Sequence, residues 1–190
     1  MKRLFLNVML FLLFCMFVTS LLSTEVSVSN LPFMPDVPKE HYKAVDFWAD
    51  VYSKKYNIPR GIIDGVLYRE TLWEDDFEDY NAFVIGDRGS KSQSYGPGQV
   101  KIRTAKSIWR GNDIDVTKDK LLYDVAFNVE TSCKLLRILY DDMSKYYKKD
   151  KDRWLAALTT YNMGHNGFLI KNKKQPNSYA YFVYGYYKKG

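Results

Sequence analysis

The chain has 190 residues, of which 46% are apolar and 26% are charged. This length and apolar content allow one domain with a hydrophobic core and exclude a disordered chain. The 28 Lys and Arg residues exceed the 22 Asp and Glu residues and give a net charge of +6, but they are scattered among acidic residues. A scattered excess is typical of an ordinary solvated surface, so charge alone does not indicate a nucleic-acid-binding protein.

The first 23 residues have the pattern of an export signal. The positively charged start is Met1-Lys2-Arg3, and an apolar run from Leu4 to Val18 follows it. Small residues suited to cleavage come next, at Ser20 or Ser23. The apolar stretch reaches Leu22 and is long enough to span a bilayer if it is not cut. Residues 1–23 are therefore either a cleaved signal peptide or an N-terminal anchor.

The chain has two cysteines. Cys15 lies in the export signal and follows Phe14, whereas a lipidation signal requires a small residue there, which argues against a lipoprotein. Cys133 would then be alone in the mature chain, so we expect no internal disulfide.

Residues 24–38 carry prolines at positions 32, 35 and 38. Because proline fixes its own backbone and lacks a donor, this spacing predicts an extended linker that ends where Pro38 can begin a helix. The folded domain is predicted to occupy residues 39–190.

Apolar residues recur at helical spacing through most of this domain. The stripes predict helices over Tyr42 to Tyr56, 61–71, Leu122 to Met143, Trp154 to Tyr161 and Tyr179 to Tyr187. The longest stripe predicts a central, buried helix. Residues 80–99 contain four glycines and many polar residues, which break the pattern and predict a small β or loop excursion. The predicted fold class is mainly α, with this excursion beside the helices.

Glu70 occupies a position where the helical pattern requires an apolar side chain, because the stripe Ile63, Val66, Leu67 continues to it. The carboxyl group either lies half exposed at the end of its helix or faces a cleft with apolar walls. In such a cleft the charged form is disfavoured and the pKa is raised. A carboxyl group of this kind can donate a proton, as cleavage of a glycosidic bond requires.

Other chemistries find less support in the sequence. His41 and His165 have no cysteine or acidic neighbours at ligand spacing, so we expect no metal site. The sequence contains no glycine-rich phosphate loop and no nucleophile elbow. We therefore expect no cofactor.

Five segments in order resemble the bacterial lytic transglycosylase and goose-type lysozyme superfamily. They are Glu70-Thr71, Gly86 to Gly89, SYGPGQV at 94–100, LTTYNMG at 158–164 and SYAYFV at 178–183. All of them except Gly86 to Gly89 correspond to motifs of that family. Those motifs read Glu-Ser, Gly-Leu-Met-Gln-Val, Ala-Tyr-Asn-Ala-Gly and a closing Tyr-x-x-x-Val. The resemblance covers about residues 58–187 and implies a lysozyme-like α+β fold whose excursion lines a saccharide groove. It also implies cleavage of the β-1,4 bond between N-acetylmuramic acid and N-acetylglucosamine in peptidoglycan.

By this resemblance Glu70 is the catalytic acid and base. A lytic transglycosylase needs one carboxyl group, because the muramoyl 6-hydroxyl replaces water and closes a 1,6-anhydro ring. The residues that match the family's substrate-binding positions are Thr71, Gln99, Tyr161, Asn162 and Tyr179. Tyr95 is a further candidate, beside the loop motif, for stacking on a sugar ring. A structural role stays open for Gln99 as a loop cap and for Tyr161 in core packing.

The sequence also departs from the family. Thr71 replaces Ser, Pro97-Gly98 replaces Leu-Met, and Thr160 replaces Ala. Asp87 resembles an acidic residue with which goose-type lysozymes activate water, but Lys101 stands where their second Asp would be. We favour anhydro chemistry; hydrolysis by Glu70 and Asp87, and a saccharide-binding module without catalysis, are the alternatives.

The resemblance implies peptidoglycan strands as the partner, and not nucleic acid. We expect an exported monomer in the periplasm or cell envelope. If residues 1–23 are retained, they would anchor it to the inner membrane.

Overall fold

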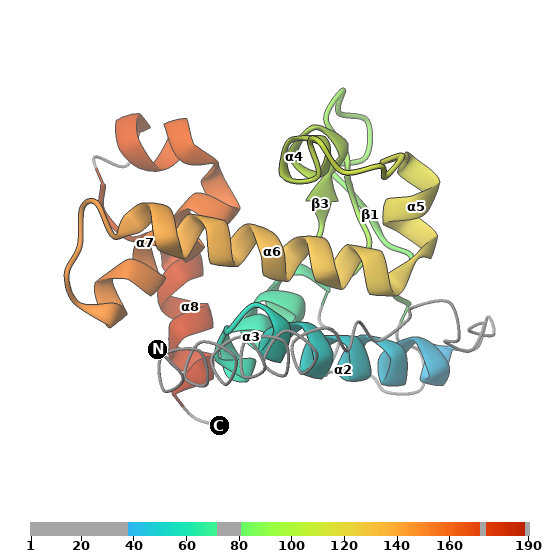
Figure 1. Ribbon diagram of the computed structural model, residues 1–190, viewed down its shortest axis with the longest axis horizontal. Helices are drawn as coiled ribbons and strands as arrows, with labels where there is room; N and C mark the ends of the chain where they lie inside the picture. Colours follow the sequence, from blue (N-terminus) through green and yellow to red (C-terminus); the bar gives the residue numbers. More distant parts are fainter. Residues whose placement is uncertain (1–37, 72–80, 172–173, 189–190) are drawn as a thin grey trace, which may run out of the picture. The chain divides into compact units, whose positions relative to one another are not determined.

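The computed structural model describes residues 38–71, 81–171 and 174–188, which fold as a mainly helical unit with a small sheet (Figure 1). Its helices are α2 (Pro38–Lys55), α3 (Arg60–Thr71), α4 (Ile102–Ile108), α5 (Lys118–Tyr123), α6 (Val125–Met143), α7 (Asp150–Met163), the π-helical segment η2 (Gly167–Lys171) and α8 (Ser178–Tyr187). The strands are β1 (Ile85–Gly86), β2 (Ser94–Tyr95) and β3 (Val100–Lys101). The predicted fold class is confirmed, including the β excursion.

The predicted signal or anchor at 1–23 and all but the last residue of the predicted linker lie outside the described residues. The first described helix, α2, begins at Pro38, where the linker was predicted to end. Among the helices of the described ranges, none combines the length and the apolar character needed to cross a membrane.

Helix α6 is the central helix, as its long apolar stripe predicts. It packs along α2 and against α7, and its other contacts include α4, α5 and β3 (Figure 1). Three polar side chains are also fully buried on it: Asn128, Thr131 and Ser132. The hydrogen bonds of Asn128 connect this helix to the loop that forms part of the site.

The predicted helix from Leu122 to Met143 is wrong at its start, because the chain forms two helices there. The carboxylate of Asp124 accepts a hydrogen bond from the backbone N–H of Phe127 and so caps the start of α6. Leu122 on α5 and Val125 on α6 are both buried. The apolar spacing therefore runs unbroken across a change of direction that spacing alone cannot detect.

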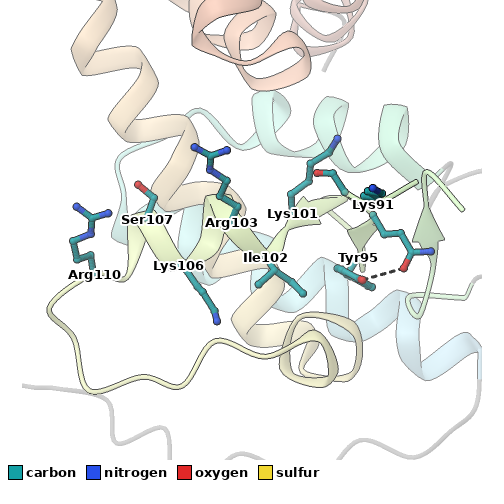
Figure 2. A pocket seen from close by; sticks show the side chains of 10 residues that line it. Lys91, Tyr95, Lys101, Ile102, Arg103, Lys106, Ser107 and Arg110 are labelled. Carbon is teal, nitrogen blue, oxygen red and sulfur yellow. Dashed lines mark hydrogen bonds between the residues drawn. The ribbon is translucent and has the colours of Figure 1, made fainter. Parts of the chain in front are cut away.

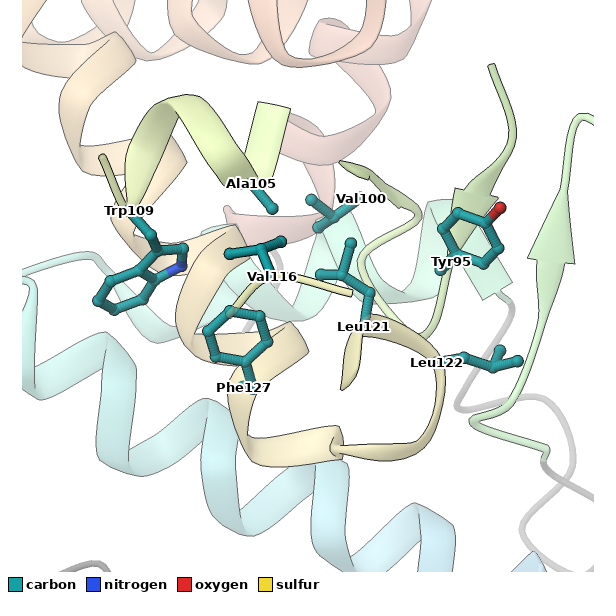
Figure 3. Close-up of a cluster of buried hydrophobic side chains, with 8 residues drawn as sticks. All are labelled: Tyr95, Val100, Ala105, Trp109, Val116, Leu121, Leu122 and Phe127. Atoms are coloured by element: carbon teal, nitrogen blue, oxygen red, sulfur yellow. The ribbon is translucent and has the colours of Figure 1, made fainter. Parts of the chain in front are cut away.

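The sheet is antiparallel in the order β1-β2-β3, with Tyr95 opposite both Ile85 and Val100. It packs with α4, α5 and the start of α6 around a hydrophobic cluster (Figure 3): Tyr95, Val100, Ala105, Trp109, Val116, Leu121, Leu122 and Phe127. The indole N–H of Trp109 donates to Thr131 on α6 at 2.9 Å, which satisfies its polar atom inside the cluster. The excursion is thus a packed layer rather than an irregular loop.

Helices α3 and α8 approach closely because α3 carries glycines one turn apart. A Cβ atom on Gly61 would lie 3.1 Å from Tyr187, and one on Gly65 would lie 3.1 Å from Val183. The pairing runs in opposite directions along the two helices, so the next contact brings Tyr179 of α8 to Glu70 of α3. Close packing of these helices therefore sets the geometry of the site.

One prediction for α8 is wrong. Phe182 belongs to the apolar stripe that predicts this helix and so is expected in the core, but its side chain is 43% exposed and its ring stacks on Tyr68 of α3 at 5.9 Å between centroids.

Candidate active site

Glu70 lies in the last turn of α3 and is half-buried, facing a cavity of about 470 Å³. The walls come from the β excursion, the start of α4, the middle of α6 and the end of α7. Among the predicted site residues, the cavity is lined by Glu70, Asp87, Gln99, Tyr161 and Asn162. Segments that lie far apart in the sequence are thus brought to one carboxyl group.

Burial raises the pKa of Glu70 above its ordinary value, and the negative charge of Asp87 adds to the rise. A hydrogen bond from Tyr179 and the positive charge of Arg69 oppose it without cancelling it. Within the described residues, no side chain forms an ion pair with Glu70. This carboxyl group consequently keeps its proton to higher pH than an exposed glutamate does.

The hydroxyl of Tyr179 donates a hydrogen bond to Oε1 of Glu70 at 2.7 Å. The Tyr179 side chain is only 6% exposed, and burial raises its pKa well above the ordinary value, so it stays a neutral donor. The bond fixes the orientation of one carboxyl oxygen. The other oxygen of Glu70 forms no hydrogen bond with a described residue.

Tyr161 holds the loop that closes one side of the cavity. Its hydroxyl donates to the carbonyl oxygen of Gly98 at 2.7 Å, while the N–H of Gly98 donates to Oδ1 of Asn128 at 2.9 Å. A Cβ atom at position 98 would lie 1.9 Å from the Ser132 hydroxyl, so only glycine fits there. The Pro97-Gly98 segment, which differs from the family pattern, therefore packs directly on the polar side chains of Asn128 and Ser132 on α6.

Gln99 lines the cavity, but its amide is bound within the protein. Its Nε2 donates to the carbonyl oxygens of Gly96 at 2.9 Å and Val84 at 3.3 Å, and its Oε1 accepts from the Ser94 hydroxyl at 2.8 Å. These bonds hold β1 and β2 to the loop before β3. The contacts correspond to the structural role left open in the sequence, and direct binding of a sugar by Gln99 stays a prediction.

Asp87 also lines the cavity, in a turn with a positive φ of 51°. Its Oδ2 lies 3.0 Å from Nζ of Lys101 in an ion pair. The side chains are 52% and 44% exposed, so solvent weakens the pair without removing it. The lysine that departs from the lysozyme pattern thus pairs with the carboxylate proposed as a second catalytic group.

Asn162 lies exposed at the end of α7 and accepts a hydrogen bond from Nδ2 of Asn177 at 3.0 Å. Asn177 in turn caps α8 by accepting from the N–H of Ala180. Asn162 therefore joins the end of α7 to the helix that carries Tyr179, besides lining the cavity.

Three predicted residues do not line the cavity, and one of them, Tyr179, still contacts Glu70. Thr71 is not among the residues that line the cavity, and its hydroxyl donates to the backbone oxygen of Leu67 at 3.1 Å. The Tyr95 ring belongs to the hydrophobic cluster and is only 6% exposed, while its hydroxyl donates to Gln93. It lines a neighbouring pocket rather than the Glu70 cavity, and stacking of this ring on a sugar stays a prediction.

Sequence reasoning missed Asn128, whose side chain is fully buried. Besides accepting from Gly98, it donates to the carbonyl oxygens of Tyr95 at 2.7 Å and Leu121 at 2.8 Å. A signal was present, because Asn128 follows Val125 by three residues and so falls on the buried stripe of α6. A polar residue at such a position indicates a backbone segment that needs hydrogen-bond partners.

Among the described residues, no group of three or more His, Cys, Asp or Glu side chains gathers in a way that could hold a metal ion.

The family model described as "Transglycosylase SLT domain" matches residues 48–183. This covers more than half of the chain, and the chain belongs to this family, within the lysozyme-like superfamily that the motifs resemble. A comparison with curated protein sequences gives no significant match. Membership supports a lytic transglycosylase type of activity on peptidoglycan.

Proposed function

We propose that this protein is a peptidoglycan lytic transglycosylase in which Glu70 acts first as acid and then as base. The observation that carries the proposal is a half-buried carboxyl group with a raised pKa, aimed into a cavity and oriented by Tyr179. A proton donor of this kind is what the departure of a sugar oxygen requires.

The reaction balances without water. Glu70 gives its proton to the glycosidic oxygen as the bond from that oxygen to C1 of N-acetylmuramic acid breaks. The resulting Glu70 carboxylate then takes the proton of the muramoyl 6-hydroxyl, whose oxygen bonds to C1. The products are an N-acetylglucosamine 4-hydroxyl and a 1,6-anhydro-N-acetylmuramic acid end, and Glu70 regains its starting protonation state.

The position of Asp87 favours this route over hydrolysis. An inverting hydrolase needs a second free carboxylate to activate water across the sugar. Asp87 lies in the same cavity, but its Oδ2 is held in an ion pair with Lys101, so this carboxylate is not free. Hydrolysis by Glu70 and Asp87 is the second candidate because both carboxyl groups face the cavity.

Digestion of purified peptidoglycan by the full chain tests the proposal. Mass spectrometry of the released fragments distinguishes anhydro ends from hydrated ends, which are heavier by one water molecule. We expect anhydro ends from the wild type and no release by Glu70→Gln, since an amide of the same shape cannot supply the proton. Hydrated ends would favour Asp87 as second catalytic group, and release by Glu70→Gln would exclude Glu70 as the acid.

We also propose that the protein is exported, as residues 1–23 predict. The mass of the protein recovered from the cell envelope tests this. A chain beginning after Ser20 or Ser23 indicates a cleaved signal, and an uncut chain in the membrane fraction indicates an anchor.

A further inference from the structure

A second pocket of about 660 Å³ adjoins the Glu70 cavity. It is formed by the segment around β2, by β3 and by α4 with the turn that follows, and Lys101 lines both pockets. Figure 2 shows its side chains spread along α4 from Arg110 at one end to Lys101 and Lys91 at the other. The Tyr95 ring belongs to the hydrophobic cluster and Ile102 packs against it, and both line this pocket.

The described lining of this pocket carries positive charge and no acidic residue. Five exposed basic side chains surround it: Lys91, Lys101, Arg103, Lys106 and Arg110. Lys101 pairs with Asp87, whereas no ion pair within the described ranges involves the other four. Arg103 and Lys106 lie one turn apart on α4, a spacing at which like charges destabilise a helix. A bound anion would relieve this repulsion.

We propose that this pocket binds carboxylate groups of the peptides attached to the glycan strand whose sugars occupy the Glu70 cavity. The inference rests on the proposed function, because peptidoglycan supplies the anion. The glycan backbone of that polymer is uncharged, and its peptides, which are attached to the muramoyl residues, carry free carboxylates. Arg side chains bind carboxylates through paired, charge-assisted hydrogen bonds.

The arrangement of the two pockets favours the substrate's own peptides over a separate ligand. Since Lys101 lines both pockets, a peptide attached near the cleaved bond reaches the basic pocket without a second encounter. A tethered group of this kind has a high effective concentration, so weak individual contacts add to affinity. The pocket would therefore select strands that carry peptides over strands from which peptides have been removed.

Binding to the full chain carrying Glu70→Gln tests this proposal without turnover. Soluble uncrosslinked strands with their peptides, and the same strands after enzymatic removal of the peptides, serve as probes. The double variant Arg103→Gln/Lys106→Gln removes two charges from the pocket. The matched control Lys148→Gln/Lys151→Gln removes two charges from exposed lysines that line neither pocket.

We expect peptide-bearing strands to bind more tightly than stripped strands, with a preference that falls as salt increases. The Arg103/Lys106 variant should bind peptide-bearing strands roughly 3- to 30-fold more weakly and stripped strands unchanged, since each exposed charge pair contributes modestly. The control variant should keep the preference.

Three outcomes would overturn the proposal. Equal binding of both strands by the parent would show that the peptides are not recognised, and equal losses in both double variants would show general attraction. Competition by a phosphodiester polymer but not by peptides would assign the pocket to that polymer. The binding comparison does not depend on cleavage. If the wild type released no products, the proposed function would be wrong, and the binding comparison could still be interpreted.

Discussion

Glu70 and Glu130 each accept a hydrogen bond from a tyrosine hydroxyl, and their surroundings differ in two respects that decide their chemistry. Glu70 accepts from Tyr179 at 2.7 Å and faces a cavity. Glu130 accepts from Tyr56 at 2.9 Å, but Nζ of Lys55 lies 2.7 Å from the same oxygen. Glu130 is thus held in an ion pair and does not line the Glu70 cavity. A tyrosine orients both carboxyl groups, but Glu70 forms no ion pair with a described residue and faces a cavity, which leaves it able to donate a proton.

The largest expected effect comes from neutralising each glutamate in turn. Glu70→Gln should lower the rate of peptidoglycan cleavage by roughly 100- to 10,000-fold, the usual contribution of a positioned acid. Glu130→Gln should leave the rate nearly unchanged, because Glu130 does not line the cavity. Release of soluble fragments over time measures both. Equal losses would mean that the substitutions act through folding.

Removing the hydroxyl of Tyr179 should change the pH dependence of the cleavage rate, whereas removing that of Tyr56 should not. The cleavage rate falls as pH rises through the pKa of Glu70, because the acid must be protonated. The Tyr179 hydroxyl lowers that pKa, so Tyr179→Phe should move this fall to higher pH. Tyr56→Phe should leave it in place. A profile unchanged in Tyr179→Phe would mean that another group controls the rate.

Asp87→Asn should move the decrease of the cleavage rate to lower pH, by a smaller amount than Tyr179→Phe moves it to higher pH. The negative charge of Asp87 raises the pKa of Glu70, and its removal also leaves Lys101 without its partner, so both changes favour the charged form. If Asp87 has only this electrostatic role, the maximal rate changes little. A loss of roughly 100-fold or more would instead identify Asp87 as a catalytic base.

The smallest expected effects concern stability, and they have opposite signs. The folded-state pKa of Glu70 is raised, so its favourable contribution is complete below the ordinary value of 4.5 and is lost as pH rises through the folded pKa. Glu70→Gln should therefore unfold at a higher temperature than the wild type near neutral pH, with the difference shrinking below pH 4.5.

Glu130→Gln should instead lose about 0.5 to 1 kcal/mol near neutral pH, because it breaks a partly exposed ion pair with Lys55. Thermal unfolding of the three proteins across pH measures both effects. A stabilised Glu130→Gln variant would contradict the role assigned to Lys55.

The sequence alone predicted the five longer helices and the residue to examine first, but not α4 and α5. Apolar spacing is a local property, so it located the main helices and showed Glu70 in an apolar position. The order of the motifs indicated the family, which the family match confirms. Spacing could not detect the break at Asp124, because buried residues continue through it.

Only the tertiary structure decided which partner each polar group has. Tyr179 lies 109 residues from Glu70 in the chain, and it reaches the carboxyl group because glycines on α3 let α8 approach. Within the β excursion, the folded loop bonds the Gln99 amide to Gly96, and Lys101 forms an ion pair with Asp87. A hydrogen bond depends on atoms within about 3 Å, and residues far apart in sequence reach that distance only when helices pack.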